Sequence, residues 1–395
     1  MTKPITILHA RVVTGAGGGP DKTILRSAAH LDRDRYHAVA AYLHPAGDTG
    51  IETLRGTAAR FGMDMHTIPE RGPLDPRSAR LMLDLCKRMH VDVWHSHDYK
   101  TDILGRLLCR QHPMKLVTTM HGFTGETWRT RLYARLSNPA LRGYDRVLAV
   151  SPQLMRYAAE HGVHPDKLRH IPNAIDLSDH RRALTRAHAK AERGIDAGEH
   201  AIGVVARFSV EKGVDRAIRL FVDVHKARPC SRLHLIGDGP QRRELEALAV
   251  QLGVSDAIRW WGWQTKPVEV AEAMDTLLLT SHTEGLPNAV LEAMAIGLPV
   301  AATRVGALPG VLAHGEAGVL LSDEPGDWLA QVLPLIDRPL YRERLLCNAR
   351  VRVEAEHDFA KRMQRVASVY EEITQREPMS TPARHAPAHI QKQAA

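Results

Sequence analysis

Short runs of apolar residues alternate along the chain with longer segments in which apolar residues recur at steps of three and four. The short runs are typical of buried strands in a parallel sheet. In the first half they span residues 5–13, 37–43, 91–95, 116–120 and 145–150. The longer segments, such as residues 77–89, predict helices between these strands. This strand-then-helix order implies right-handed crossovers and a doubly wound α/β unit.

The alternation restarts in the second half, after a polar and strongly charged stretch without a strand pattern. Strand candidates follow at residues 201–206, 232–236, 257–261, 276–280, 299–303 and 318–321. We therefore predict an N-terminal domain over residues 1–177, a linker over residues 178–200 and a second doubly wound domain over residues 201–356.

The end of the chain has a different pattern. Apolar side chains recur on one face of a predicted helix over residues 357–376, at Phe359, Met363, Val366, Tyr370 and Ile373. A helix with this pattern needs an apolar surface to pack against. The last segment, residues 377–395, is rich in Pro, Ala, His and Ser, and we expect it to be disordered.

The composition is that of a soluble globular protein, with 395 residues, 44% of them hydrophobic and 25% charged. No apolar run reaches the roughly 18 residues that cross a bilayer, and the first residues lack a signal-peptide pattern. We therefore expect a cytoplasmic protein. The four cysteines lie far apart in the sequence, which argues against a zinc site and against a disulfide framework.

Basic residues outnumber acidic residues by 53 to 45, which gives a net charge of +8 and favours an anionic partner. No zinc-finger spacing, aromatic RNA-binding strand or basic heptad region accompanies this charge. We therefore expect no nucleic-acid partner.

A glycine-rich loop follows the first predicted strand and precedes a helix. Gly17 and Gly18 are candidate ligand contacts, because glycine lets a backbone approach a phosphate at a helix N-terminus. Pro20 stands where the dinucleotide fingerprint requires its last glycine, and no acidic residue ends the second predicted strand. Both departures argue against NAD binding.

The strongest constellation lies just after the predicted strand 276–280. Glu284 stands on a tight loop, and Glu292 stands eight residues later in the helix that begins near Asn288. The backbone amides between Gly285 and Asn288 are free to bind an anion at this helix N-terminus. The segment predicts a site that holds hydroxyl groups at its two ends and a negative charge between them.

Two cations follow the first predicted strand of the second half. Arg207 stands at the end of that strand, and Lys212 stands where the next helix begins. Because ligands of such sheets bind at the carboxyl ends of the strands, both side chains are expected beside the two glutamates. A pair of cations there suits a pyrophosphate.

These residues resemble the retaining, nucleotide-sugar-dependent glycosyltransferases of family 4. The resemblance rests on an E-x7-E block, an R-x4-K pair, a G-D-G-P turn, a glycine loop, a T-x-H-G block and an I-P-N block. In the same order, these motifs stand at Glu284 to Glu292, at Arg207 and Lys212, at residues 237–240, at Gly17 to Gly19, at residues 119–122 and at residues 171–176. The matching segments keep the family order over nearly the whole chain.

The resemblance implies the GT-B fold, in which two Rossmann-like domains face each other and the last helix crosses back to the first domain. It implies hexosyl transfer from a UDP- or GDP-linked sugar to a saccharide or lipid-linked acceptor, in cell-envelope or exopolysaccharide biosynthesis. It also implies that no cofactor and no metal ion is needed.

The resemblance implies a role for each motif residue. Arg207 and Lys212 hold the donor diphosphate, Glu292 the ribose, and Glu284 the hydroxyl groups of the donor sugar. His121 lies beside the transferred sugar from the opposite domain. The remaining donor contacts are expected from the backbone of the two loops, at Gly17, Gly18, Gly285, Leu286, Pro287 and Asn288.

Two other motifs invite a metal interpretation. The run His95-Ser96-His97-Asp98 places possible ligands close together, but Asp98 follows His97 directly and the spacing of metallo-hydrolases is not met. A strand-end turn near the acceptor side is the favoured interpretation. Asp32-Arg33-Asp34 imitates a metal-binding D-x-D motif, and we interpret it as a surface segment that closes a helix.

A basic segment over residues 128–146 combines arginines with apolar residues. An ordinary solvated helix is the simpler interpretation. The alternative is a basic amphipathic face that places the protein peripherally on an anionic membrane, as a lipid-linked acceptor would require.

Two other functions share the predicted architecture. A nucleotide-sugar 2-epimerase would act on the donor without an acceptor, and a catalytically silent protein would only bind the nucleotide sugar. The combination of E-x7-E with R-x4-K favours transfer over both. The sequence does not identify the nucleotide base, the sugar or the acceptor.

Overall fold

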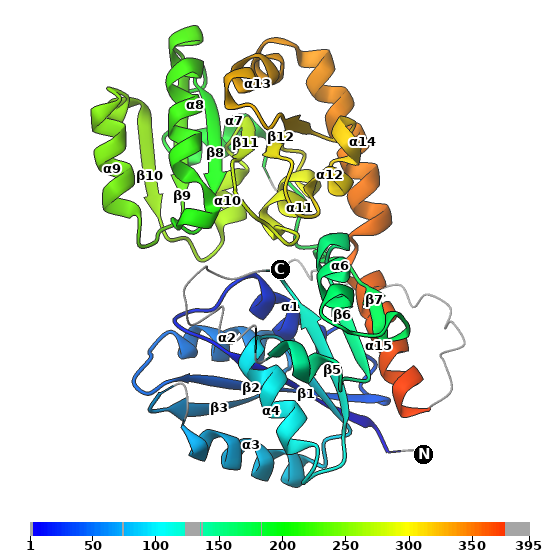
Figure 1. Cartoon of the computed structure of the whole chain (residues 1–395). Coiled ribbons are helices and arrows are strands. Elements are labelled where there is room, and N and C mark those ends of the chain that lie inside the picture. The colour runs from blue at the N-terminus through cyan, green and yellow to red at the C-terminus, as the bar shows by residue number, and fades with distance from the viewer. Residues whose placement is uncertain (1–2, 73–74, 123–134, 136, 183, 376–395) are drawn as a thin grey trace, which may run out of the picture.

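The computed structural model shows two parallel sheets, each covered by helices on both faces (Figure 1). It describes residues 3–72, 75–122, 135, 137–182 and 184–375. All strand pairs within the two sheets are parallel. This confirms the predicted doubly wound architecture in both halves.

The first sheet has seven strands in the order β3-β2-β1-β4-β5-β6-β7. They are β1 (Ile5–Val12), β2 (Tyr36–Pro45), β3 (Asp64–Glu70), β4 (Val93–Ser96), β5 (Lys115–Met120), β6 (Arg146–Ala149) and β7 (Leu168–His170). The apolar runs predict five of these strands and miss β3 and β7. β3 mixes polar residues with Pro69, and β7 has only three residues, so neither carries a recognisable apolar run.

Side chains alternate between the two faces of this sheet, as the strand period of two requires. Ile5 and Ile7 of β1 pack with α1, α2 and α15, whereas Leu8 and Ala10 pack with α3, α4 and α6. These helices are α1 (Gly19–Ser27), α2 (Ile51–Phe61), α3 (Pro76–Met89), α4 (Tyr99–Leu108), α6 (Pro152–Glu160) and α15 (Phe359–Thr374). The sheet is therefore buried on both faces.

The second sheet has six strands in the order β10-β9-β8-β11-β12-β13, and each matches a predicted run. They are β8 (His200–Val205), β9 (Ser231–Ile236), β10 (Ile258–Gly262), β11 (Thr276–Leu279), β12 (Val300–Thr303) and β13 (Val319–Leu321). The helices around it are α8 (Val214–Ala227), α9 (Arg242–Gln251), α10 (Pro267–Ala271), α11 (Asn288–Ala295), α12 (Leu308–Val311), α13 (Trp328–Asp337) and α14 (Pro339–Glu356).

The stretch predicted as a linker contains a short helix, α7 (Arg186–Glu192). Ala189 of this helix and Ile195 after it are buried in the core of the second sheet. These two core positions could not be predicted from the charged sequence, because single apolar residues among charged ones give no periodic signal. The domain boundaries themselves remain a prediction.

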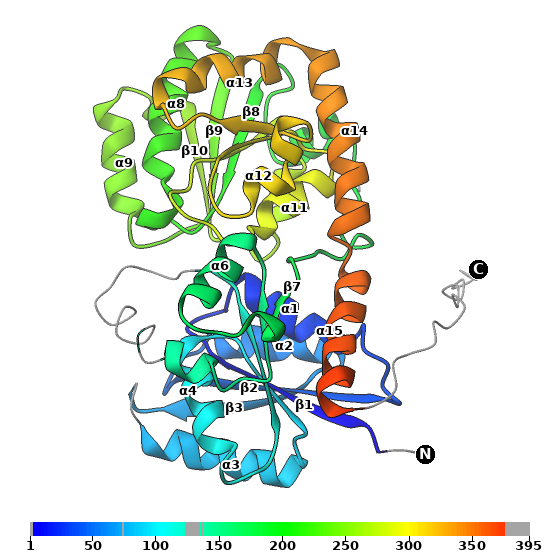
Figure 2. The ribbon, with the colours of Figure 1, turned by 45° about the vertical axis from the view of Figure 1, so that its right-hand side comes forward.

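The last helix crosses back to the first half, as predicted. α14 lies on the second half, the chain bends at His357, and α15 packs on the first sheet (Figures 1 and 2). Ile175 holds the bend, because its amide donates to the His357 carbonyl and its own carbonyl accepts from the Phe359 amide. The tail after residue 375, which we expect to be disordered, lies outside the described residues.

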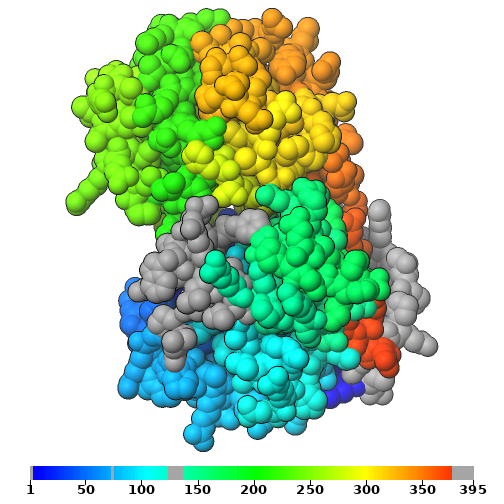
Figure 3. All heavy atoms as spheres, viewed as in Figure 1, coloured from blue at the N-terminus to red at the C-terminus, as the bar shows by residue number. Residues whose placement is uncertain are grey.

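The two halves touch through a shared apolar core as well as through the crossing helix. Val150 and Leu154 of the first half belong to the same buried cluster as Leu286 and Val290 of the second half. The space-filling view shows the green atoms around α6 in contact with the second half (Figure 3). In the described part of the chain, no helix combines the length and apolarity that crossing a membrane requires.

A carboxyl group is buried inside the first half. Asp102 of α4 lies among three hydroxyl groups, which contact it from Ser96 at 2.6 Å, Thr118 at 2.7 Å and Ser137 at 3.1 Å. Burial is the main reason why the pKa of Asp102 rises to about 7, because the ionised form loses its hydration.

The raised pKa of Asp102 predicts a pH-dependent stability. Between the unfolded-state pKa and about 7, the folded protein keeps this proton while the unfolded chain releases it. The free energy of unfolding should therefore fall as the pH rises through this range, by up to about 1.4 kcal/mol per pH unit. Asp102→Asn should remove this slope in urea unfolding at pH 5 and pH 7. Asp166→Asn, which changes an exposed carboxylate, is the control, and equal slopes in wild type and Asp102→Asn would contradict the assignment.

Candidate active site

The candidate site lies where the carboxyl ends of the two sets of strands meet. The loop after β11 carries Glu284 and leads into α11, which carries Glu292. Residues after β1 and β5 of the first half contact this segment. We call residues 280–292 the junction, together with the first-half residues that contact them, which are Gly19, Lys22, His121, Gly122 and Asn173.

Glu284 is the most closely bound charge at the junction. Its two carboxylate oxygens accept hydrogen bonds from Lys212 Nζ at 2.7 and 2.9 Å, and one of them also accepts from Ser281 Oγ at 2.7 Å. Its exposed fraction is only 9%. The structure therefore brings together two predicted site residues that stand 72 positions apart in the sequence.

The backbone fixes Lys212 beside Glu284. Lys212 ends the short 3-10 helix η2 (Val210–Lys212), and Gly213 follows it with a φ of +55°. A Cβ atom at Gly213 would lie 2.4 Å from the carbonyl oxygen of Thr280, which shows how closely the two loops approach. Thr280 Oγ1 also donates to the Gly213 carbonyl at 2.7 Å. The ion pair is thus set by packed backbone as well as by charge.

Arg207 is the exposed member of the cation pair. It makes no ion pair with any residue that the structure describes. The G-D-G-P turn holds its loop, because Phe208 donates its amide to the Asp238 carbonyl and Gly237 approaches the Ala206 carbonyl closely. Arg207 is therefore an exposed cation on a fixed backbone, with no ion-pair partner in the part of the chain that the structure describes.

Glu292 is buried in the second turn of α11 and faces the first half. Lys22 Nζ of α1 lies 3.4 Å from its carboxylate, and His180 Nε2 lies 3.9 Å from it. Neither partner was predicted from the sequence. Lys22 carries a weak signal, since it stands in the first turn of the helix after the glycine loop, whereas nothing in the sequence distinguishes His180 from the other histidines.

The start of α11 presents uncapped amides to the junction. Pro287 is its N-cap and offers no side-chain acceptor. The amides of Gly285 and Leu286 donate no hydrogen bond to the residues that the structure describes. First-turn amides and the positive end of the helix dipole favour an anion here. The side-chain oxygen of Asn288, at the first position of the helix, is buried and finds no hydrogen-bond partner in the described part of the chain.

The glycine loop approaches the same helix from the first half. A Cβ atom at Gly19 would lie 3.4 Å from Asn288 Nδ2. Gly17 has a φ of +74°, and its position leaves no room for a side chain beside Asp21. The Gly18 amide donates to the Asp21 carboxylate at 2.7 Å, so it already has an acceptor. The predicted donor contacts at Gly17 and Gly18 stay a prediction.

His121 lies directly after β5, on the first-half side of the junction. Its backbone carbonyl oxygen would be 2.4 Å from a Cβ atom at Gly285, so the two segments are in direct contact. Burial, reinforced by the charges of Arg11 and Arg362, lowers the pKa of His121 well below its usual value. His121 is therefore a neutral imidazole at neutral pH, and its Nδ1 is buried without a hydrogen-bond partner among the described residues.

Three histidines form the only group of three or more potential metal ligands found among the described residues. They are His9, His95 and His97, whose ring nitrogens lie within 4.8 Å of one another. Asp98 does not join them, because it caps α4 and accepts the Val12 amide at 2.7 Å. Buried Arg362 acts electrostatically on His9 and His95, and its positive charge disfavours a metal cation there.

The structure also shows where the second possible metal-binding motif lies. Asp32, Arg33 and Asp34 lie in an exposed turn before β2. The expectation that this motif closes a helix is wrong, because α1 ends at Ser27 and a further turn intervenes. Its surface position agrees with the interpretation that it is not a site.

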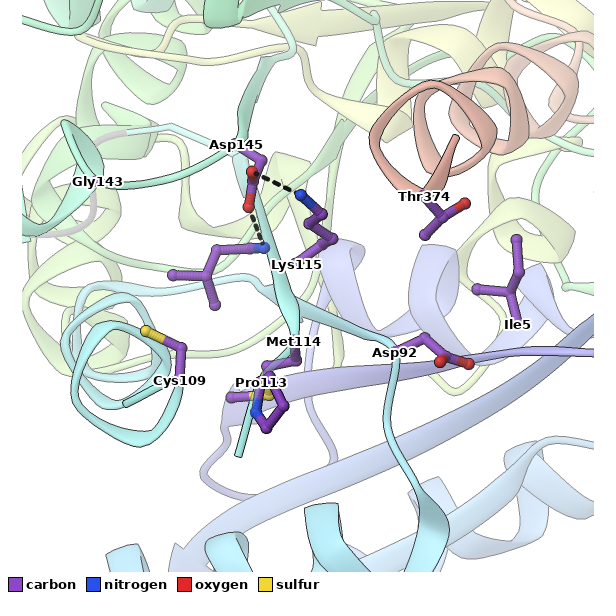
Figure 4. A pocket seen from close by; sticks show the side chains of 10 residues that line it. Ile5, Asp92, Cys109, Pro113, Met114, Lys115, Gly143, Asp145 and Thr374 are labelled. Atoms are coloured by element: carbon purple, nitrogen blue, oxygen red, sulfur yellow. Dashed lines mark hydrogen bonds and ion pairs between the residues drawn. The ribbon is translucent and has the colours of Figure 1, made fainter. Parts of the chain in front are cut away.

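A hollow of about 590 Å³ lies at the opposite edge of the first sheet (Figure 4). It is lined by residues at the amino ends of β1, β4, β5 and β6. Its two carboxylates already accept backbone amides, Asp92 from Thr6 and Asp145 from Leu116, both at 2.8 Å. These bonds stabilise strand ends, so the hollow carries no sign of catalytic chemistry.

Part of the basic segment serves the fold. Arg142 donates to the His161 carbonyl at 3.0 Å, and Arg146 of β6 pairs with Glu372 of α15. Most of its apolar residues, and Arg129 and Arg131, lie outside the described residues.

Comparisons with known proteins agree with this geometry. The family model described as "Glycosyl transferases group 1" matches residues 185–352, and the model described as "Glycosyltransferase Family 4" matches residues 17–179. The D-inositol 3-phosphate glycosyltransferase of Thermobispora bispora is 30% identical over 308 residues, which cover 72% of this chain and 71% of the relative. The chain belongs to the group 1 glycosyltransferases of family 4.

Other glycosyltransferases of this family are similarly related. The N-acetyl-alpha-D-glucosaminyl L-malate synthase of Bacillus anthracis is 28% identical over 79% of this chain and 81% of its own. The D-inositol 3-phosphate glycosyltransferase of Segniliparus rotundus is 30% identical, and the alignment spans 66% of this chain and 61% of the relative. The activity that these names share is glycosyl transfer.

Solved structures show the same fold at low identity. HepE from Anabaena, crystallised with UDP and glucose, is 18% identical with a TM-score of 0.80, over 93% of this chain and 100% of its own. WaaG, a glycosyltransferase of lipopolysaccharide biosynthesis, is also 18% identical with a TM-score of 0.72, over 93% of this chain and 99% of its own. The predicted GT-B arrangement is thereby confirmed.

The contact at Gly285 predicts a measurable opening of the two halves. In Gly285→Ala the added methyl group would meet the His121 carbonyl, so the junction should separate at a cost of about 1–3 kcal/mol. We expect a larger radius of gyration in small-angle X-ray scattering and a lower melting temperature. Gly310→Ala is the matched control, because nothing lies within 4 Å of its Cβ position. Unchanged scattering by Gly285→Ala would show that the halves do not meet at this glycine.

Proposed function

We propose that the chain is a retaining glycosyltransferase that moves a hexosyl group from a nucleoside diphosphate sugar to a saccharide or lipid-linked acceptor. One observation carries this proposal: Lys212 binds both oxygens of buried Glu284, in a loop whose next amides are unoccupied by any described residue. A positive charge, an acceptor and free amides meet there. This combination suits a phosphate next to a sugar hydroxyl group.

The donor diphosphate would lie between Arg207, Lys212 and the start of α11. The two cations and the helix amides offset the charge that grows on the phosphates as the sugar leaves. Because these groups are fixed by the backbone, little reorganisation is needed during the reaction. We infer that they do the work of a metal ion, so that none is required.

The two glutamates would hold the hydroxyl groups of the donor. A carboxylate accepts about four hydrogen bonds, and Glu284 uses three of them on Lys212 and Ser281, which leaves one for a sugar hydroxyl. Glu292 would bind the ribose, in exchange for its long contact with exposed Lys22. Leu286, Pro287 and Asn288 would supply backbone contacts between the two.

His121 would contact the transferred sugar from the first half. Its neutral ring and its unpartnered Nδ1 suit a hydrogen bond to an oxygen of the sugar. The first half would then hold most of the acceptor. We do not assign a covalent nucleophile, and retention would follow from attack on the same face through an oxocarbenium-like state.

The identity of the donor is supported by analogy. HepE structures contain UDP or UDP-glucose, and UDP or GDP is the nucleotide that we propose for this chain. The pathway we propose is cell-envelope or exopolysaccharide biosynthesis in the cytoplasm, with peripheral contact to an anionic membrane if the acceptor is a lipid.

The central ion pair predicts which variants lose activity. Lys212→Met and Glu284→Gln should each lower kcat by roughly 10²- to 10³-fold, since each removes a fixed charge next to the reacting bond. The double variant removes both charges and should fold as the wild type does, with the same loss. Lys266→Met, which removes an exposed lysine paired with Glu269, is the control.

Product analysis completes this test. The rate of glycosyl transfer should be measured with and without a chelator, and the anomeric configuration of the product should be determined by NMR. Full activity of both single variants would overturn the site assignment. Conversion of the donor to a new sugar without any acceptor would identify an epimerase instead.

The exposed charge of Arg207 beside the start of α11 predicts nucleotide binding. UDP or GDP should raise the melting temperature, because a ligand that binds the folded state stabilises it. Arg207→Met should reduce this rise, whereas Arg243→Met, which removes another exposed arginine, should not. Equal rises in both variants, or none with UDP, GDP and ADP, would contradict the proposed donor site.

A further inference from the structure

Three histidines from adjacent strands form a hydrogen-bonded chain that ends at the junction. His9 lies on β1, His97 follows β4, and His121 follows β5. His9 Nδ1 lies 3.0 Å from His97 Nε2, and His97 Nδ1 lies 3.0 Å from His121 Nε2. The rings stack at centroid distances of 5.3 Å in both pairs. His9 and His121 are 112 positions apart in the sequence, and the parallel strand order β1-β4-β5 brings all three histidines together.

A fourth histidine stacks on this chain but is not part of it. The ring of His95 lies 4.4 Å from that of His97. Its nitrogens bind other groups, with Nδ1 at 2.6 Å from the Tyr370 hydroxyl and Nε2 at 2.7 Å from Thr119 Oγ1. His95 therefore shares the burial of the chain without sharing its hydrogen bonds.

The chain can carry its protons in only two arrangements. A neutral imidazole has one N–H donor and one bare nitrogen acceptor. If His9 donates to His97, then His97 must donate to His121, and the proton of His121 is on Nδ1. If the direction is reversed, Nδ1 of His121 is bare and Nε2 of His9 carries a proton. The tautomer of His121 is thus tied to that of a residue two rings away.

All three rings are neutral. Burial lowers the pKa of His9 to about 3 and those of His97 and His121 well below their usual value. The guanidinium groups of Arg11 and Arg362 act in the same direction, because they oppose a further positive charge. The two arrangements are therefore the ones that matter at neutral pH.

Arg362 of α15 distinguishes the two arrangements. It is buried, and among the described residues its Nε has no hydrogen-bond partner, its Nη1 donates to Met363 Sδ at 3.7 Å, and no carboxylate pairs with it. It acts electrostatically on His9, whose Nε2 is also buried without a hydrogen-bond partner among the described residues, and it acts less strongly than Arg11 on His121. A guanidinium has donors and no acceptor, so it favours a bare His9 Nε2 over a protonated one. Arg11, by contrast, is compensated by Asp21 at 2.8 Å.

We propose that His9 and His97 are positioning residues that keep the proton of His121 on Nδ1, so that His121 presents an N–H donor to an oxygen of the bound donor sugar. Arg362 sets the direction at the far end of the chain, and His97 transmits it. The inference rests on the proposed function for the place of His121 next to the sugar. The tautomer itself is a property of the free protein and can be measured without any substrate.

A metal site is the competing interpretation of the same residues. A metal ion on His9, His95 and His97 would use nitrogens that now make hydrogen bonds to one another, to Tyr370 or to Thr119. It would also lie near the uncompensated charge of Arg362. Metal analysis of the purified protein tests this directly, and one bound zinc per chain would overturn the hydrogen-bonded chain.

The first experiment measures the tautomers in the free protein. Histidine labelled with ¹⁵N gives well-separated signals for bare and protonated ring nitrogens, and single variants of each histidine assign them. We expect His9, His97 and His121 to be protonated on Nδ1. A protonated Nε2 on His121 would overturn the proposal.

Paired variants test whether the chain transmits this preference. His97→Met interrupts both bonds, so His121 should show a mixture of tautomers. His97→Gln keeps one acceptor and one donor, and His121 should keep its proton on Nδ1. His95→Gln is the control for burial and stacking. If His97→Met fails to fold, Arg362→Met answers the same question, since it removes the charge that sets the direction. An unchanged His121 signal in His97→Met or in Arg362→Met would overturn the proposal.

Kinetics connect the tautomer to transfer. His97→Met should lower kcat by roughly 10- to 100-fold, the range of a misdirected acid-base or hydrogen-bonding group, with KM for the donor little changed. His97→Gln should restore most of the wild-type rate. If the NMR results agree and the rates of all variants are equal, the role of the chain in positioning is overturned. If neither the wild type nor any variant transfers sugar, the proposed function is wrong, and the tautomer result is unaffected.

Discussion

The site depends on the close approach of two backbones that belong to different halves of the molecule. The His121 carbonyl after β5 lies against Gly285 after β11, in a space that a single methyl group would overfill. Asn173 reinforces this approach by donating from its side chain to the Leu286 carbonyl at 2.9 Å. This approach brings Lys22 of α1 within 3.4 Å of Glu292 of α11.

The same approach explains how one of the two buried acids is tolerated. Glu284 and Glu292 are each less than a tenth exposed, and an unpaired buried carboxylate is costly. Glu284 is compensated within its own half by Lys212, whereas Glu292 is met by Lys22 from the other half. One acid is therefore preorganised by its own domain, and the other depends on how the two domains sit together.

The crossing helix links this arrangement to the interior of the first half. α15 packs its apolar face on the first sheet and brings Tyr370 and Arg362 beside the buried histidines. The block Ile171 to Asp176 anchors the crossing, since the Asn173 carbonyl contacts His357 and the amide of Ile175 donates to the same residue. A helix from the end of the chain thus takes part in the environment of His121.

Much of the fold could be read from the sequence, because apolar periodicity reports burial directly. The runs predicted all six strands of the second sheet, and the spacing of Phe359 to Ile373 predicted the last helix. Glu284, Glu292 and Lys212 could be named because loops after parallel strands share one edge of a sheet. The sequence did not predict β3, β7 or the core positions of α7, because short or isolated apolar segments resemble loops.

Only the tertiary structure decided which groups meet. Lys22 pairs with Glu292 across 270 positions, and three of the 23 histidines form a chain, because strand order and domain contact, and not spacing, determine such neighbours. Sequence alone determined what each segment buries and which edge carries the chemistry. The partner of each buried charge and each ring nitrogen was decided by long-range packing, which leaves no local periodic signal.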